Sequence, residues 1–183
     1  MNRKALVIAA LVAASGVQFA QAADGTINFN GELVNQTCTI AVDGVVTPTA
    51  ATVTLPTVST SQLTAAGQSA GATGFNIQLT NCVGTAATAA AFFEAGSTVD
   101  PVSGNLRNTT GGATNVQLQL IDSGSATGAV IQAGNTNQRT QTTRNTIDAS
   151  GAANMPYAVQ YFATGATTPG TVVSSVTYSV DYQ

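Results

Sequence analysis

Apolar and polar residues alternate in short stretches along most of this chain, and this alternation restricts its fold more than any other feature. Phe75, Ile77 and Leu79 alternate with polar residues, and residues 176–183 repeat the pattern at the end of the chain. A period of two places the apolar side chains on one face of a β-strand. Turn-forming residues separate these stretches, and no long stretch has the period of an amphipathic helix. The sequence therefore predicts an all-β sandwich with about seven or eight strands.

The predicted strands are distributed along the chain after residue 24. We expect them at residues 25–34, 38–42, 51–55, 75–80, 89–94, 116–120, 157–161 and 172–182, and a short piece at 129–132 could pair with 116–120 as a hairpin. Residues 57–73 are rich in small and polar residues, which predicts an irregular connection with room for one helical turn. Residues 135–150 are mostly Thr, Asn and Gln and are expected at the surface, and residues 164–170 are expected to form a loop.

The first 22 residues have the pattern of a secretory signal peptide. Arg3 and Lys4 precede an apolar run from residue 5 to residue 14, and Ala20-Gln21-Ala22 forms a small-residue cleavage site. The apolar run is too short to span a bilayer. The alternative interpretation is a disordered apolar start. Cleavage after Ala22 leaves 161 of the 183 residues, a length that fits one domain with a substantial core.

Charge excludes several classes of partner. Residues 23–183 contain Arg107, Arg139 and Arg144, no lysine and eight acidic residues, which gives a formal net charge of −5. Such an acidic chain is a poor ligand for nucleic acid or anionic lipid. Because no other long apolar run follows the signal peptide, we also expect no membrane insertion. The exported chain holds two cysteines, Cys38 and Cys82, and an oxidising compartment favours one disulfide between them over two free buried thiols.

An enzyme is not expected. The chain has no histidine, the commonest general base and metal ligand. No motif of a serine hydrolase, phosphate-binding loop or zinc protease is present. The acidic residues are scattered singly, and Glu32 and Glu94 are the only glutamates. We therefore expect no catalytic residues, no metal site and no cofactor.

Alternating strands are predicted at both ends of the mature chain. One lies within residues 25–34, where Gly31 interrupts the apolar face, and the other ends at Gln183. On periodicity alone, the simpler interpretation is that the two ends are neighbouring strands of one closed sandwich. The other interpretation is that the first strand completes the sheet of a different molecule.

Four segments in order resemble the pilins of the Gram-negative chaperone–usher pathway, most closely the major subunit of type 1 fimbriae. The segments are residues 27–38 (INFNGELVNQTC), 74–82 (GFNIQLTNC), 161–165 (YFATG) and 178–183 (YSVDYQ). Together with the signal peptide and the spacing of the two cysteines, these segments extend the resemblance over the whole chain. The resemblance implies an immunoglobulin-like sandwich that lacks its last strand and leaves a groove lined by core residues.

The resemblance also implies how the groove is filled. A periplasmic chaperone would occupy it first, and at an outer-membrane usher the N-terminal extension of the next subunit would replace the chaperone strand. This is β-strand addition, in which main-chain hydrogen bonds give affinity and pockets for alternate side chains give specificity. The partners are then identical or related pilin subunits, the chaperone and the usher. The location is the periplasm during export, followed by a fimbria on the cell surface.

The resemblance assigns roles to three groups of residues. The inward face of the donor strand would consist of Gly25, Ile27, Phe29, Gly31 and Leu33, although the short segment before Ile27 leaves its N-terminal limit open. Cys38 and Cys82 match the family disulfide between the first two strands. The C-terminal strand that pairs with chaperone and donor would present Val176, Tyr178, Val180, Tyr182 and Gln183, with the Gln183 carboxylate in a basic cleft of the chaperone. For Gly31, a local bulge is the alternative to a shallow pocket.

The expected organisation is a signal peptide at 1–22, a donor-strand extension at 23–36 and a pilin domain at 37–183. The expected function is that of a structural subunit that supports adhesion by polymerising into a fimbria. A minor or adaptor subunit of the fibre is an alternative within the family. A stand-alone secreted β-sandwich binding module is an alternative outside it, and such a module would need its own last strand.

Overall fold

The computed structural model describes residues 27–28, 30–31, 33 and 35–183, and the predicted signal peptide lies outside them. Leu33–Gln183 form one compact unit. Its strands are β1 (Thr37–Val42), β2 (Val45–Val46), β3 (Ser69–Val83), β4 (Thr88–Phe93), β5 (Leu106–Arg107), β6 (Val116–Asp122), β7 (Ala129–Ile131), β8 (Asn145–Thr146), β9 (Ala153–Ala163) and β10 (Tyr178–Tyr182). A 3₁₀ turn at Thr60–Gln62 and the short helix α1 (Gln138–Gln141) complete the elements.

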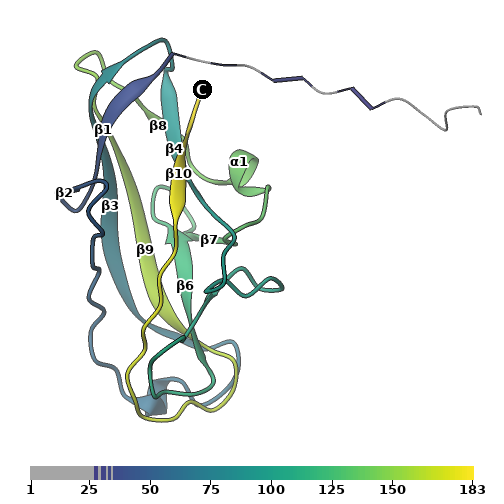
Figure 1. The fold of residues 1–183 in the computed structure, drawn as a ribbon. Helices are drawn as coiled ribbons and strands as arrows, with labels where there is room; N and C mark the ends of the chain where they lie inside the picture. The colour runs from purple at the N-terminus through teal and green to yellow at the C-terminus, as the bar shows by residue number, and fades with distance from the viewer. Residues whose placement is uncertain (1–26, 29, 32, 34) are drawn as a thin grey trace, which may run out of the picture. The chain divides into compact units, whose positions relative to one another are not determined.

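The strands form two antiparallel sheets (Figure 1). The large sheet has the order β2-β1-β3-β9-β6-β5, with β7 also paired to β6. The small sheet has the order β10-β4-β8, so β10 is one of its edges. β3 and β9 run side by side over most of their length, from Ser69 opposite Phe162 to Leu79 opposite Ala153. This long pair forms the centre of the large sheet, and the small sheet packs against the large one.

The core lies between the two sheets. Phe75, Ile77 and Leu79 of β3 are buried together with Phe93 of β4. Tyr157 of β9, which is 1% exposed, connects the layers. Its ring lies 5.2 Å from that of Phe93 in an edge-to-face arrangement, and its phenol oxygen accepts a hydrogen bond of 2.9 Å from the Ala91 N–H. The alternation predicted for β3 and β9 is confirmed because each buries one face, whereas β4 is buried on both faces from Ala89 to Phe93.

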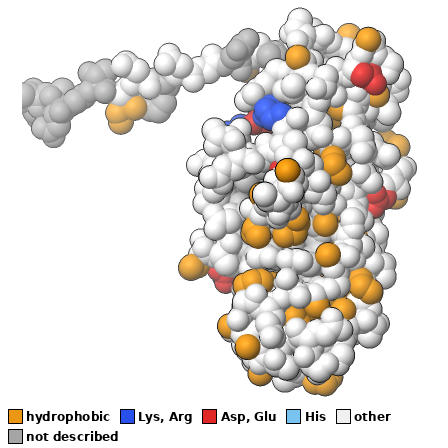
Figure 2. Space-filling view, turned by 180° about the vertical axis from the view of Figure 1, so that it is seen from behind, with side chains coloured by type: hydrophobic (Ala, Val, Ile, Leu, Met, Phe, Trp, Pro, Cys, Tyr) orange, Lys and Arg blue, Asp and Glu red, His pale blue; other side chains and the backbone are white. Residues whose placement is uncertain are grey.

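The surface carries few charges. Only 7% of the residues are charged, and Figure 2 shows that most of one face is neither charged nor hydrophobic. Thr, Ser, Asn, Gln and Gly provide this surface, as expected from composition.

Most predicted strands are confirmed, including the hairpin that pairs β6 with β7. The prediction of an irregular segment is wrong for residues 69–73, because β3 already begins at Ser69. The register of β3 with β9 shifts between Ala70 and Thr73, and Gly71 adopts φ +67°. This bulge interrupts the alternation on which the sequence prediction depends.

The surface prediction for residues 135–150 is wrong in part. Gln138 and Thr142 are buried, and β8 pairs with the beginning of β4. Gln138 can be buried because its amide bonds the backbone of Phe93 in both directions, by accepting from the N–H at 2.9 Å and donating to the carbonyl at 3.0 Å. Because Gln138 is polar, the sequence gives no sign that its side chain is buried and bonds the backbone of a strand.

Candidate functional site

One edge of β10 has no neighbouring strand in the described part of the chain. The other edge pairs with β4, with Ser179 opposite Phe92 and Asp181 opposite Ala90. Figure 1 shows β10 in yellow alongside β4, leading to the C-terminus. An unpaired sheet edge presents free N–H and C=O groups to any extended segment that approaches it.

The backbone groups at this open edge belong to the even-numbered residues. Gln183 donates to the Thr88 carbonyl at 2.9 Å and accepts from its N–H at 2.8 Å, and Thr177 accepts from the Glu94 N–H at 2.9 Å. Odd-numbered residues therefore turn their backbone toward β4. Since backbone direction alternates along an antiparallel strand, Tyr178 and its even-numbered neighbours turn theirs toward the open edge. The even-numbered residues from Val172 to Tyr182 have no backbone partner among the described residues.

The side chains of the same residues point inward. Val172, Val176, Tyr178, Val180 and Tyr182 pack against the core but stay partly exposed. Burial raises the pKa of the Tyr178 and Tyr182 phenols. The Ser174 hydroxyl and the Tyr178 phenol oxygen are buried without a hydrogen-bond partner in the described structure. The open edge thus combines free backbone groups with an incompletely covered apolar face.

The predicted strand at residues 51–55 forms no ladder. Its burial nevertheless alternates, with Ala51, Val53 and Leu55 half-buried and Thr52 and Thr54 exposed. Val53 and Leu55 pack against the same core as Val180 and Tyr182. Two strand-like segments, residues 51–55 and residues 172–182, thus border the same core. Among the described residues, 51–55 has no hydrogen-bonded strand neighbour, and neither does the open edge of 172–182. We call these two borders together the acceptor edges.

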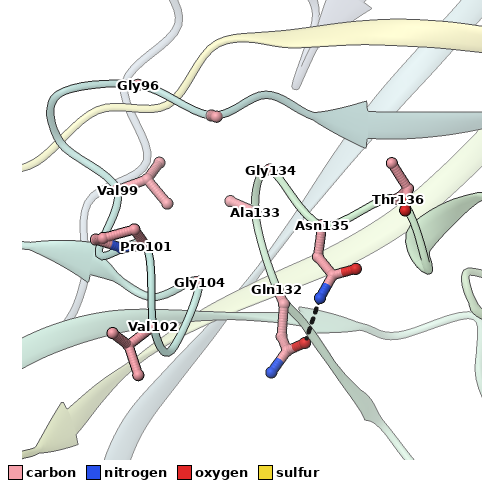
Figure 3. Close-up of a pocket in the computed structure, with 11 residues that line it drawn as sticks. Gly96, Val99, Pro101, Val102, Gly104, Gln132, Ala133, Gly134, Asn135 and Thr136 are labelled. Carbon is pink, nitrogen blue, oxygen red and sulfur yellow. Dashed lines mark hydrogen bonds between the residues drawn. The ribbon is translucent and has the colours of Figure 1, made fainter.

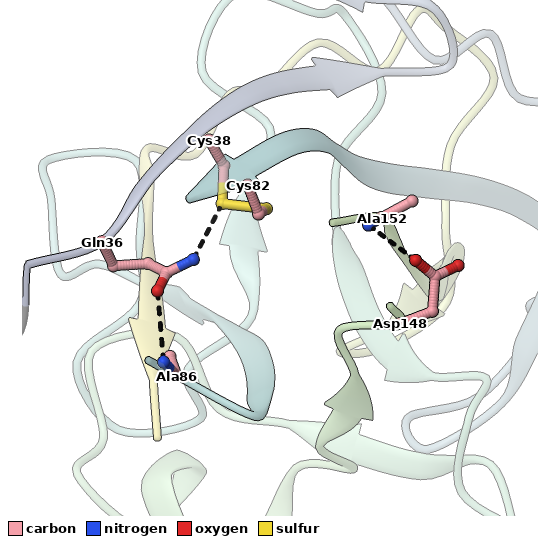
Figure 4. The surroundings of a disulfide bond; sticks show 6 residues. All are labelled: Gln36, Cys38, Cys82, Ala86, Asp148 and Ala152. Atoms are coloured by element: carbon pink, nitrogen blue, oxygen red, sulfur yellow. Dashed lines mark hydrogen bonds between the residues drawn. A yellow bond between two sulfur atoms is a disulfide. The ribbon is translucent and has the colours of Figure 1, made fainter. Parts of the chain in front are cut away.

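A disulfide fixes the N-terminal end of β1. Cys38 of β1 is bonded to Cys82 of β3, with 4.1 Å between their Cα atoms (Figure 4). Beside it, the Gln36 side chain accepts a hydrogen bond from the Ala86 N–H at 3.2 Å. Gly151, at φ +74°, approaches so closely that a Cβ atom would lie 2.6 Å from the Cys82 carbonyl oxygen. The point at which the predicted extension joins the domain is therefore firmly held.

A separate surface cavity of about 370 Å³ lies between residues 95–104 and residues 132–136 (Figure 3). Val99, Pro101 and Val102 line one side, and Gln132 accepts a 3.0 Å hydrogen bond from the Asn135 side chain on the other. Its lining contains no titratable side chain. The cavity therefore offers no side chain for acid–base chemistry.

The described residues also contain no cluster of three or more His, Cys, Asp or Glu that could hold a metal ion. Within the same part of the chain, no helix has the length and apolar character needed to cross a bilayer.

Comparison with known proteins identifies the family. The family model described as "Type-1 fimbrial protein, A" matches residues 55–183, which is more than two thirds of the chain. The chain belongs to the type-1 fimbrial protein family. This fimbrial subunit is 44% identical over 165 residues to the major fimbrial subunit SMF-1 of Stenotrophomonas maltophilia, a match that covers 89% of this chain and 95% of the relative.

A second relative agrees with this assignment, and one solved structure shares the fold. The type-1 fimbrial protein A chain of Escherichia coli K12 is 36% identical over 179 residues, which cover 96% of this chain and 90% of that protein. The crystal structure of the P pilus rod subunit PapA matches with a TM-score of 0.58 and 17% identity, over 80% of this chain and 99% of the other. The PapA likeness shows the fold alone. The protein is a structural fimbrial subunit with an immunoglobulin-like pilin fold, and its family assembles with other pilin subunits into surface fimbriae.

The predicted site residues of this fimbrial subunit fall into three groups. The disulfide between Cys38 and Cys82 is formed. The C-terminal strand is shorter than predicted, because β10 begins at Tyr178, and Val176 lies in the irregular segment before it. Gly25 and Phe29 of the predicted donor strand lie outside the described residues. Ile27 is 77% exposed, Leu33 is fully exposed and Gly31 has no atom within 4 Å of a Cβ position. Their role as donor residues stays a prediction.

Sequence reasoning missed three features of the site. It predicted 51–55 as an ordinary strand, although Val53 and Leu55 border an open edge. It gave no role to Ser174, and it placed Arg139 at the surface without its partner Asp181. The alternation at 51–55 was a usable signal for the border, but no local pattern could pair an arginine with an acid 42 residues away.

Proposed function

We propose that this fimbrial subunit polymerises by donating its extension, residues 23–36, to the acceptor edges of the next subunit. The observation that carries the proposal is the open edge of β10, where free backbone groups and half-buried apolar side chains occur on the same residues. A strand added there would bond the even-numbered residues from Val172 to Tyr182. Its inward side chains would cover the partly exposed apolar face.

The extension has the composition that such a strand needs. Ile27, Phe29 and Leu33 would enter the core of the neighbour, and Asn28 and Asn30 would face solvent. Each large apolar side chain transferred from water contributes about 1.5–3 kcal/mol. Gly25 and Gly31 would occupy inward positions at which the groove of the neighbouring subunit is shallow. The exposure of Ile27 and Leu33 in the isolated chain supports this arrangement.

Before assembly, the same edges need temporary cover, because an exposed apolar edge promotes aggregation. We propose that a periplasmic chaperone supplies this cover after export and that an outer-membrane usher exchanges it for the next subunit. One oxygen of the Gln183 carboxylate accepts from the N–H groups of Ala87 and Thr88 at 2.7 and 2.8 Å. These bonds hold the C-terminal group in a fixed position, from which its second carboxylate oxygen can enter a basic cleft of the chaperone.

The experiment compares two faces of one strand. The double variant Ile27→Asp, Phe29→Asp places two charges on the inward face of the extension. The matched control, Asn28→Asp, Asn30→Asp, places the same charges on the outward face of the same stretch. Fibres are imaged by electron microscopy in a gene-deletion strain that expresses each variant, and subunit–chaperone complexes are isolated from the periplasm.

We expect the inward variant to bind chaperone and to form no fibres, while the control forms fibres like those of the unchanged protein. Loss of the whole fibre in the deletion strain is expected for a major subunit, whereas a remaining fibre would indicate a minor or adaptor subunit. Fibres of normal length from the inward variant would overturn donor-strand assembly. A purified protein that remains a monomer and accepts no added strand would favour a stand-alone binding module.

A further inference from the structure

We propose that Arg139 and Arg144 are positioning residues for strand addition, because together they hold β10 on β4 through Asp181. This inference rests on the donor-strand function proposed above. The two arginines act at the edge of β10 that is paired with β4, and this pairing fixes the alignment of the other, open edge.

The two arginines converge on a single acid. The Arg139 Nη1 atom lies 3.0 Å from Asp181 Oδ2, and the Arg144 Nη1 atom lies 3.6 Å from the same oxygen. Arg144 also donates from Nη2 to the backbone carbonyl of Asp181 at 2.8 Å, and from Nε to the Thr88 hydroxyl at 3.1 Å. Since Thr88 belongs to β4, Arg144 joins the two strands directly.

Two members of this cluster are shielded from solvent. The side chains of Asp181 and Arg144 are only 17% and 18% exposed, so salt screens them weakly, whereas the Arg139 side chain is 56% exposed. The Arg139 guanidinium lies over the Phe92 ring, 4.9 Å from its centroid, which adds a cation–π contact with β4. Arg139 and Arg144 are two of the three positive side chains in residues 23–183.

The arginines project from a segment that is itself anchored. Gln138, directly before Arg139, bonds the backbone of Phe93 in β4 in both directions. Directly before Arg144, the Thr143 N–H donates to the buried Asp122 carboxylate at 2.7 Å. The chain next to Arg139 is therefore anchored on β4, and the chain next to Arg144 is anchored on β6.

The cluster lies on the face of β10 opposite the core. Val180 and Tyr182 on either side of Asp181 pack inward, so the Asp181 carboxylate points outward. A substitution in the cluster thus removes no side chain that a donor strand would contact. It would loosen the pairing of β10 with β4 and with it the alignment of the open edge.

The chain offers a matched control for this proposal. Asp181→Asn removes the charge from the cluster with little change of shape. Asp100→Asn does the same to the pair formed by Asp100 and Arg107, whose closest atoms are 3.7 Å apart and which lies away from β10. If Asp181→Asn does not fold, Arg139→Gln removes only the more exposed arginine and serves instead.

Two measurements on the purified subunit test the proposal. The first is hydrogen exchange of the Ser179, Asp181 and Gln183 amides, which bond to β4. The second is the association rate of a synthetic peptide with the sequence of residues 23–36. For Asp181→Asn we expect about tenfold faster amide exchange, which corresponds to the loss of one charge-assisted hydrogen bond, and peptide association that is slower by a similar factor. Asp100→Asn should match the unchanged protein in both.

Each outcome decides a separate question. Equal exchange and equal association rates for the two variants would overturn the positioning role. Faster exchange with an unchanged association rate would also overturn it, because the cluster would then only stabilise the strand. Failure of the unchanged protein to bind the peptide would contradict the proposed function instead. The exchange measurement would then still show whether the arginines stabilise the pairing of β10 with β4.

Discussion

At the scale of single residues, Tyr157 shows how one side chain connects the two sheets. Its ring packs on Phe75 and Phe93 at centroid distances of 5.9 and 5.2 Å, and its oxygen accepts from the Ala91 N–H. The alternation of β9 predicted that Tyr157 points inward. The phenol's partner on the other sheet could not be predicted, because it depends on how the sheets are placed.

The buried phenol predicts a loss of stability at high pH. Burial raises the pKa of Tyr157 to about 12, above its ordinary value of 10.0. The folded state therefore retains the proton over a range where the unfolded chain has released it. This contribution is fully present below pH 10 and is lost as the pH rises from about 10 to about 12, by on the order of 2 kcal/mol. Guanidinium unfolding at several pH values measures it.

Tyr157→Phe should flatten this part of the pH profile and should cost about 1 kcal/mol at neutral pH, because the Ala91 N–H loses its acceptor. Tyr161→Phe is the comparison variant: burial also raises the pKa of the Tyr161 phenol, but its ring is only partly buried, so this variant should flatten the profile less. A Tyr157→Phe profile that falls as steeply as that of the unchanged protein would contradict the role given to the phenol.

At the scale of elements, the sequence predicted those strands that bury one uniform face. β3 from Phe75 to Thr80, β6, and β9 from Ala153 to Gln160 alternate in burial, and all three are confirmed. Residues 69–73 escaped prediction because the bulge at Gly71 shifts the register. Gln138 escaped because a buried amide resembles a surface amide in sequence. Residues 51–55 keep the burial pattern of a strand without a ladder, so pattern alone could not show that they lack a partner.

The disulfide belongs to this scale because it joins β1 to β3 next to the extension. It closes a loop with a sequence separation of 44 residues, for which chain entropy predicts about 4 kcal/mol of stabilisation. The double variant Cys38→Ser, Cys82→Ser should therefore unfold at lower guanidinium concentration and accumulate less in the periplasm. Val83→Ser, at an exposed neighbouring position, should have little effect. Equal unfolding midpoints for the cysteine variant and the unchanged protein would show that the bond is dispensable.

At the scale of the whole molecule, the chain has two features that match each other. Ile27 and Leu33 are exposed apolar side chains, and residues 51–55 and 172–182 border an incompletely covered core. Membership of the type-1 fimbrial protein family gives these features a common purpose, since fimbriae are polymers of such subunits. The resemblance to pilins predicts that these features pair between subunits, whereas composition and periodicity reached only a β-sandwich.

The most direct test of the account is a cryo-electron microscopy reconstruction of the assembled fibre. We predict that residues 25–33 of one subunit form a strand along the open edge of β10 in its neighbour, with Ile27, Phe29 and Leu33 pointing into the core. A reconstruction in which each subunit covers its own β10 edge, with residues 25–33 outside the neighbouring core, would contradict the account.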